Sequence, residues 1–304
     1  MTSPALRGEV ILPFAIVTLI WSSTWIVIRD SLGVVPPAWS VCYRFAIAAA
    51  GMAVLAALTR TSLRLPPRAI AFAALLGTAQ FSMNFNLLYR AEAHLTSGLC
   101  ALVYALLMIP NSLFAWAIFR EKVSPAFILG SFIAVAGVAL LFLNEYRASV
   151  TAAPAEVLLG LGLCTIAVLF ASSANVMQAA QIARNVPMTS LIFWAMAIGA
   201  GVDAVYAFIT TGLPPFDARP TYWLGTVYLA LAGSVITFPL YFRLIQRIGA
   251  GPAAYTSLLI PVIAMAISTA VEGYRWTPLA IAGVLLALGG MVVALRSRLR
   301  QARS

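Results

Sequence analysis

Apolar residues fill ten stretches of the chain, and short polar linkers separate them. The stretches are residues 10–28, 38–58, 69–89, 95–119, 125–143, 157–177, 188–209, 221–242, 250–271 and 276–295. About 20 apolar residues in helical conformation span the hydrocarbon core of a bilayer. No linker is long enough to form a soluble domain. The pattern therefore predicts an all-α membrane protein with ten transmembrane helices.

One spacing of residues occurs twice, 151 residues apart: a tyrosine, a proline six residues later, and a glutamate eleven residues after the proline. The copies are Tyr104, Pro110 and Glu121, then Tyr255, Pro261 and Glu272. After each glutamate the match continues with Pro125, Gly130, Ala134 and Gly137 against Pro278, Gly283, Ala287 and Gly290. Internal repeats in an apolar chain are typical of secondary transporters. We therefore divide the chain into two five-helix repeats, residues 1–150 and 151–304.

Composition agrees with a membrane protein and argues against a nucleic-acid-binding one. Hydrophobic residues make up 62% of the 304 residues and charged residues 9%, a balance that a soluble core could not bury. The net charge is +10, but Lys122 is the one lysine and the arginines are scattered through short loops. We attribute this charge to membrane orientation and expect the lipid bilayer, not nucleic acid, as the partner.

The basic residues predict how the helices are oriented. With the N-terminus in the cytoplasm, thirteen of the nineteen lie on the cytoplasmic side, five lie on the other side, and Arg44 is inside a helix. Cytoplasmic loops carry the excess of basic residues, so both termini, including the basic C-terminal tail, are expected inside. Five helices per repeat is an odd number. The second repeat must then enter from the opposite face, which predicts two inverted repeats.

Few residues suit enzymatic, metal or ATP chemistry. The single histidine, His94, is expected in a short external linker, and Lys122 has no glycine-rich phosphate loop beside it. Cys42, Cys100 and Cys164 all fall in apolar stretches, which indicates neither a disulfide framework nor a metal site. We expect no enzyme, no cofactor and no metal, and transport driven by a gradient of substrate or of a coupling ion.

The chain resembles the EamA-type members of the drug/metabolite transporter superfamily from about residue 10 to 296. Trp21-Ser22-Ser23 in the first helix, Arg44-Phe45 in the second and the duplicated tyrosine–proline–glutamate spacing carry the resemblance. Ser22 stands where the family often has glycine, and serine also permits close helix packing. The resemblance implies a carrier in the cytoplasmic membrane of a bacterium, usually an exporter of amino acids, metabolites or amphipathic toxic compounds.

Tyr104 and Tyr255 are the first candidates for binding substrate, because they occupy equivalent positions in the two repeats. Each precedes a helix-interior proline, which frees a carbonyl and bends the helix, as carriers do around a cavity at mid-depth. The alternative is a pair of interfacial tyrosines in an aromatic belt. Both residues lie about nine positions inside their apolar stretches, roughly 14 Å deep by helical rise, which favours the cavity.

Four further side chains are candidates for the same cavity. Gln80 and Asn84 are spaced i, i+4 and share one helix face, which should point inward because amides are costly in hydrocarbon. They would either bind substrate or hold helices together. Trp21 and Trp25 also share a face and could stack on a ligand, with a lipid-facing belt as the alternative.

Two charged residues lie inside predicted helices, and such charges are functional candidates. Arg44 and Asp203 are expected at similar depth, so they could form an ion pair, or Arg44 could extend to the interface or bond to local carbonyls. Asp203 is also a candidate for coupling transport to protons. Glu121 and Glu272, at helix exits, are expected to cap the following helix.

These observations predict a secondary transporter for a small-molecule substrate, exporting amino acids or small amphipathic metabolites by alternating access. An importer of similar solutes and a non-transporting membrane structural protein are the alternatives.

Overall fold

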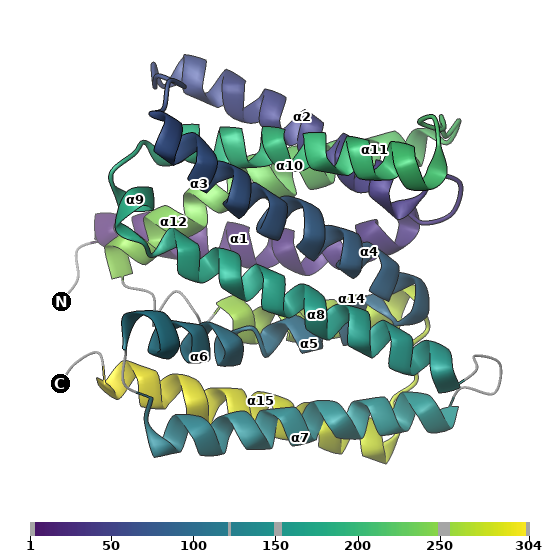
Figure 1. The fold of residues 1–304 in the computed structure, drawn as a ribbon. Helices are drawn as coiled ribbons and strands as arrows, with labels where there is room; N and C mark the ends of the chain where they lie inside the picture. Colours follow the sequence, from purple (N-terminus) through teal and green to yellow (C-terminus); the bar gives the residue numbers. More distant parts are fainter. Residues whose placement is uncertain (1–3, 121–122, 149–153, 249–255, 302–304) are drawn as a thin grey trace.

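The computed structural model describes residues 4–120, 123–148, 154–248 and 256–301. This part of the chain is helical apart from its connections (Figure 1). In chain order the elements are α1 (Pro4–Ser31), α2 (Pro37–Leu58), α3 (Pro67–Gly77), η1 (Thr78–Met83), α4 (Asn84–His94), α5 (Ser97–Ala105), α6 (Met108–Phe119), α7 (Pro125–Ala148), α8 (Pro154–Gln178), α9 (Gln181–Arg184), α10 (Met188–Thr211), α11 (Pro220–Ala230), η2 (Leu231–Ile236), α12 (Thr237–Ile248), α14 (Thr256–Val271) and α15 (Pro278–Gln301).

Within the described residues, seven helical stretches are long and apolar enough to cross a membrane. They are Val10–Ser31, Pro37–Leu58, Ser97–Phe119, Pro125–Asn144, Ala155–Gln178, Met188–Thr211 and Pro220–Tyr241. The remaining predicted spans correspond to the run α3–η1–α4 and to the shorter apolar helices Leu259–Val271 and Pro278–Ala294. The chain is therefore an all-helical, multi-pass membrane protein.

Proline decides where several helices begin and where one is interrupted. Helices α2, α3 and α11 carry proline in their first positions, where its fixed φ and missing N–H are tolerated. Pro110 acts differently, because a proline ring inside a helix clashes with the carbonyl four residues earlier, here that of Leu106. The helix is interrupted at Leu106 and Leu107, between α5 and α6, as the position of Pro110 predicts. The equivalent Pro261 lies inside the continuous helix α14, so the predicted interruption is found in the first repeat only.

The end of α4 corrects one prediction. His94 is the last residue of this helix rather than part of an external linker. Its Nδ1 lies 3.9 Å from Oε2 of Glu156 on α8. The apolar stretch ends near residue 89, but the helix continues for another turn because α4 packs against α8.

Two π-helical segments lie at matching places in the two halves. The segments η1 and η2 begin at Thr78 and Leu231, 153 residues apart. This is the offset at which the small-residue helices repeat in the sequence. Short π-helical segments often occur at functional sites, because they leave backbone carbonyls without their usual i+4 partners.

Helices that are equivalent in the two halves pack against each other in antiparallel pairs. Figure 1 shows α7 and α15 side by side. A Cβ atom built on Gly137 would lie 2.2 Å from the backbone nitrogen of Ala287, and one built on Gly130 would lie 2.5 Å from that of Ala294. Only glycine allows this backbone contact. The predicted role of these small residues in close helix packing is confirmed.

The pairs α2–α10 and α5–α14 also run antiparallel. Trp39 near the start of α2 donates to the carbonyl of Gly212 just after α10, with a distance of 3.3 Å. Trp194 near the start of α10 donates to the carbonyl of Leu63 beyond α2, at 2.8 Å. In the second pair, Gly98 near the start of α5 lies against Met265 of α14.

Three further pairs of helix contacts correspond between the two halves. Helix α4 packs on α8, as α12 packs on α1. Helix α3 packs on α10, as α11 packs on α2. Helix α1 packs on α14, as α8 packs on α5 and α6. In each pair of contacts, the helices of one half correspond to those of the other, as expected for duplicated halves.

Candidate functional site

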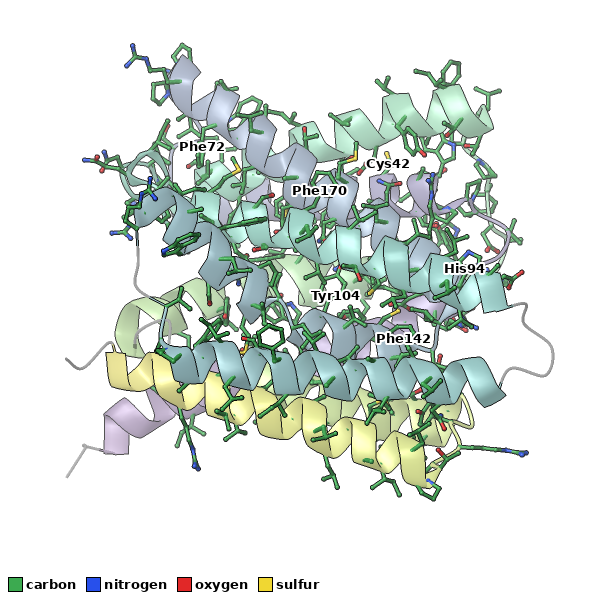
Figure 2. All side chains as sticks on the ribbon, turned by 60° about the horizontal axis from the view of Figure 1, so that its bottom comes forward. Cys42, Phe72, His94, Tyr104, Phe142 and Phe170 are labelled. Atoms are coloured by element: carbon green, nitrogen blue, oxygen red, sulfur yellow. The ribbon has the colours of Figure 1, made fainter. Side chains whose placement is uncertain are left out.

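Tyr104 of α5 lies at the centre of a polar cluster inside the bundle. Its hydroxyl donates a hydrogen bond to Oδ1 of Asn84, at 2.6 Å. Nδ2 of Asn84 donates to the backbone carbonyl of Gln80 in η1, at 3.2 Å. Figure 2 places Tyr104 well inside the bundle, while His94 lies near one end. The position of Tyr104 favours the cavity interpretation over the aromatic belt.

Gln80 and Asn84 are both buried, so the inward-facing side predicted for them is confirmed. The amide oxygen of Gln80 is buried without a hydrogen-bond partner. A buried polar atom without a partner costs about 1–3 kcal/mol. This oxygen is therefore available to accept a hydrogen bond from a bound molecule.

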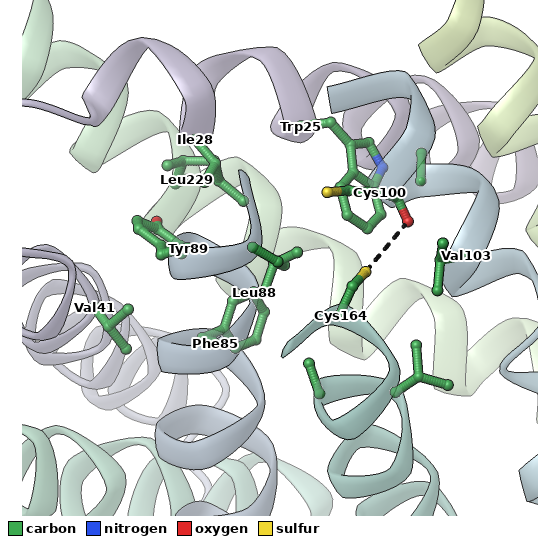
Figure 3. Packing of buried hydrophobic residues seen from close by; sticks show 14 of the residues in the cluster. Trp25, Ile28, Val41, Phe85, Leu88, Tyr89, Cys100, Val103, Cys164 and Leu229 are labelled. Atoms are coloured by element: carbon green, nitrogen blue, oxygen red, sulfur yellow. Dashed lines mark hydrogen bonds between the residues drawn. The ribbon is translucent and has the colours of Figure 1, made fainter. Parts of the chain in front are cut away.

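Trp25 of α1 completes the group that we call the Tyr104 cluster: Tyr104, Asn84, Gln80 and Trp25. The indole and phenol rings are T-shaped, with centroids 5.0 Å apart. The indole nitrogen of Trp25 is buried and has no hydrogen-bond partner. Figure 3 shows Trp25 beside Cys100 of α5. Four of the six residues predicted to bind substrate thus lie together.

Trp21 lies one turn earlier on α1 and contacts α12 and η2. Its nitrogen donates to the carbonyl of Gly233, at 3.3 Å, and its ring lies 5.7 Å from that of Phe238 and 5.1 Å from that of Tyr241. Both tryptophans pack on neighbouring helices, which disfavours the lipid-facing belt. Tyr255, the sixth predicted residue, lies outside the described residues.

Arg44 is buried, so it neither extends to the interface nor bonds to local carbonyls, the two arrangements that the sequence suggested besides an ion pair. Nη1 points to the hydroxyl of Tyr89 and Nη2 to that of Ser234, both at 3.5 Å, and the guanidinium lies 4.4 Å from the ring centroid of Phe85. These hydrogen bonds are at the long limit. An aromatic face stabilises a cation, so Arg44 is held by rings and hydroxyls.

Asp203 of α10 is fully buried and accepts a hydrogen bond from Nδ2 of Asn86, at 2.8 Å. Among the described residues, no ion pair joins it to Arg44. The alternative of an Arg44–Asp203 pair is therefore wrong for this conformation. Helix α10 packs chiefly on α2, α3 and η1, and Asp203 links it to α4.

Glu272 caps a helix of the other half rather than the following helix, which corrects that prediction. Its carboxylate accepts from the backbone N–H of Ser97 at the start of α5, at 3.2 Å, and from the Ser97 hydroxyl, at 2.6 Å. Ser268 also donates to it. Arg29 of α1 lies 4.0 Å from the carboxylate and donates to the carbonyls of Glu92 and Leu95. We call Arg29, Glu272 and Ser97 the end network.

The sequence reasoning missed Glu92 and Asn86. Glu92 has no exposed surface, and both of its carboxylate oxygens are buried without a hydrogen-bond partner. It was assigned to a linker because the apolar window stopped at residue 89. Asn86 was overlooked although it is a third amide in the polar run that contains Gln80 and Asn84. Both could have been found from the sequence, because polar residues continue at helical spacing from Gln80 to Glu92, beyond the end of the apolar stretch at residue 89.

The fold and this cluster define a class of protein: a multi-pass membrane transporter with two related halves. Residues 9–143 and 158–296 each match the model of the EamA-like transporter family, so the chain belongs to that family. It is a transporter and not an enzyme.

Three curated relatives cover most of this chain. Protein PagO of Salmonella typhimurium is 24% identical over 86% of this chain and 84% of its own length. YedA of Escherichia coli, an uncharacterized inner membrane transporter, is 28% identical over 89% and 88%. A probable terminal-alkyne amino-acid exporter of Streptantibioticus cattleyicolor is 25% identical over 93% and 92%. A solved crystal structure matches with a TM-score of 0.68 and 19% identity, over 95% of this chain and 97% of that one, which shows a shared fold.

Proposed function

We propose that this transporter exports neutral amino acids or similar small amphipathic metabolites across the cytoplasmic membrane by alternating access. The observation that carries the proposal is the Tyr104 cluster, which brings two aromatic rings and two amides together inside the bundle from three segments of the first half. The similarity to a probable amino-acid exporter supports the substrate class.

The proposed topology has ten transmembrane helices in two inverted repeats, residues 1–150 and 151–304, with both termini in the cytoplasm. The antiparallel pairing of α2 with α10 and of α7 with α15 supports it, because inverted halves bring equivalent helices together in opposite directions. A reporter fused after residue 304 should fluoresce and show no alkaline phosphatase activity. Phosphatase activity there would contradict the topology.

Alternating access follows from the exchange of contacts between the halves. Each half can adopt the shape that the other now holds, and exchanging the shapes opens one cavity to the opposite face. We propose that α1, the helices from α3 to α6, α8, α11 to α12, and α14 line this cavity. Tyr104 and Tyr255 would stand on opposite sides of its midplane.

The chemistry of the cluster favours a zwitterionic or neutral substrate. The unpartnered oxygen of Gln80 accepts hydrogen bonds, the unpartnered indole nitrogen of Trp25 donates one, and the rings of Trp21, Trp25 and Tyr104 offer apolar contact. A phosphate or a metal ion would need compensating charge in a low-dielectric site. Within the described residues, no group of metal-binding side chains is assembled.

Substrate counterflow in proteoliposomes tests this proposal. Vesicles loaded with unlabelled leucine, phenylalanine or threonine should take up the labelled form of the same amino acid from the bath, and empty vesicles should not. Loading with phosphate is the control and should give no uptake. The proposal is wrong if none of the neutral amino acids shows counterflow.

A further inference from the structure

We propose that Glu92 is the proton-carrying group of this transporter, which would make export an exchange of substrate for protons. The inference rests on the proposed function and adds the energy source and the residue that couples to it. The carboxyl group of Glu92 is buried, and no hydrogen bond to another residue compensates for that burial.

Glu92 has no hydrogen bond to its carboxylate. The side chain is 0% exposed and both oxygens are buried without a partner. An ionised carboxylate in this state loses its hydration and gains no hydrogen bond in return, a cost that a protein avoids by keeping the group neutral. This conformation therefore favours the protonated acid.

The neighbouring cations are engaged elsewhere. Arg29 donates to the backbone carbonyls of Glu92 and Leu95 and pairs with Glu272. Arg44 points its amino groups to Tyr89 and to Ser234 of η2. Neither guanidinium is bonded to the Glu92 carboxylate.

The titratable groups around Glu92 come from every element packed near it. They are Arg29 of α1, Arg44 of α2, Tyr89 and His94 of α4, Cys100 and Tyr104 of α5, Cys164 and Glu156 of α8, and Glu272 of α14. The thiols and phenols are neutral near pH 7. A charge on Glu92 would be repelled by the carboxylate of Glu272 in the end network and attracted by Arg29 and Arg44.

Glu92 lies directly behind the end network. Arg29 bonds to its carbonyl, and Glu272 joins α14 to the first turn of α5. Separation of these helices would bring water to Glu92 and let its carboxyl group lose or gain a proton. Closure would bury it again and favour the neutral acid. The protonation of Glu92 and the closing of this end are therefore linked, as proton coupling requires.

The exchange cycle is balanced in protons. With the end open, a proton from the water outside binds the Glu92 carboxylate as substrate leaves. After the halves exchange shapes, the cavity opens to the cytoplasm, and the next substrate to reach the Tyr104 cluster displaces the proton from Glu92, which lies within electrostatic range of Tyr104. The proton then leaves through the open cavity into the cytoplasmic water. One proton enters for each substrate exported, and no other reactant is needed.

Asp203 is the competing proton carrier and the matched control. It is also a fully buried acid, but it accepts a hydrogen bond from Asn86 and lies on α10, away from the end network. Its bonded oxygen, Oδ1, links α10 to α4, while Oδ2 is buried without a partner, so one oxygen is satisfied in Asp203 and neither is in Glu92. Replacement by asparagine keeps its shape, so Asp203→Asn should retain proton coupling.

The test compares counterflow, at equal pH on both sides, with accumulation of labelled leucine, phenylalanine or threonine driven by an acidic vesicle lumen. Wild-type protein should show both. Glu92→Gln should keep counterflow and lose the acid-driven accumulation, while Asp203→Asn keeps both. Absence of counterflow in the wild type would contradict the proposed function. Counterflow without acid-driven accumulation in the wild type would overturn this inference alone.

Two further outcomes decide against Glu92: acid-driven accumulation that survives in Glu92→Gln, or its loss in Asp203→Asn instead. If Glu92→Gln loses both activities, Glu92→Asp decides the question, because it keeps an ionisable group on a side chain one methylene shorter. Counterflow together with acid-driven accumulation in Glu92→Asp supports the inference. Any other result in that variant refutes it.

Discussion

Two adjacent glycines of α15 allow the α7–α15 contact to be tested within one helix. A Cβ atom added to Gly290 would lie 2.3 Å from the backbone nitrogen of Ala134 and 2.5 Å from the carbonyl oxygen of Gly130. A Cβ atom added to Gly289 would meet nothing within 4 Å. Gly290→Ala is therefore the perturbation, and Gly289→Ala is its control.

The expected magnitude follows from these distances. Ordinary van der Waals contact begins at 3.4 Å, so the helices must separate locally by about 1.1 Å at Gly290. Overpacking of this kind costs about 1–3 kcal/mol, and contacts along the neighbouring turns are weakened as well. Alanine is the better helix former by up to about 1 kcal/mol, which offsets part of the cost at Gly290 and leaves Gly289→Ala neutral or stabilised.

The assay is reversible unfolding of both variants in detergent micelles or bicelles, followed by tryptophan fluorescence. Gly290→Ala should unfold at lower denaturant concentration than the wild type, and Gly289→Ala at an equal or higher one. Substrate selectivity should be unchanged in both, because α7 and α15 lie outside the proposed cavity. Equal stability of the two variants would refute the close-contact argument.

Three other predictions concern the site, the end network and a loop. Tyr104→Phe should weaken counterflow by about tenfold, because it leaves Asn84 without a donor at a cost of about 1–3 kcal/mol, and Tyr104→Ala should weaken it further; a wild-type rate in Tyr104→Ala would assign the ring to packing. Glu272→Gln should weaken the end network and speed maleimide labelling of buried Cys100, read by mass spectrometry; unchanged labelling would show that other contacts hold this end. The side-chain hydrogen bond from the neighbouring arginine lowers the pKa of Asp217, so its contribution to stability is present above the unfolded pKa of about 3.9 and is lost as pH falls through the lower folded value. Asp217→Asn should therefore have a lower free energy of unfolding than the wild type at pH 7 and an equal one in strong acid. A difference in stability that persists in acid would contradict the linkage.

Periodicity and small residues made much of the helical architecture predictable. The repeated Gly130 and Gly283 indicate close packing because lipid supplies no hydrophobic force between helices. The interruption of the helix before Pro110 was also predictable from a local steric rule. The segments η1 and η2 were not, because neither contains a proline and their compositions differ, with three polar residues in TAQFSM and one in LAGSVI.

The candidate site was predictable in composition but not in its connections. Gln80 and Asn84 stand out because an amide is expensive in hydrocarbon, and that cost requires a partner without naming one. Tyr104 lies 20 residues from Asn84, and Asn86 meets Asp203 at a separation of 117. Such partners depend on how the helices are assembled. Glu92 was missed for a different reason. A search for apolar residues ends where the last turn of the helix becomes polar, although the helix itself continues to His94.

The location of the π-helical segments connects the site to the movement that a carrier needs. In η1 the carbonyl of Gln80 accepts from Asn84, whose oxygen holds the Tyr104 hydroxyl. In η2 the carbonyl of Gly233 accepts from Trp21 and from Thr237. Side chains of the candidate site thus satisfy carbonyls that a regular helix would bond internally. A ligand that takes over the Tyr104 hydroxyl or the Trp21 indole changes these bonds, and it does so at equivalent places in the two halves.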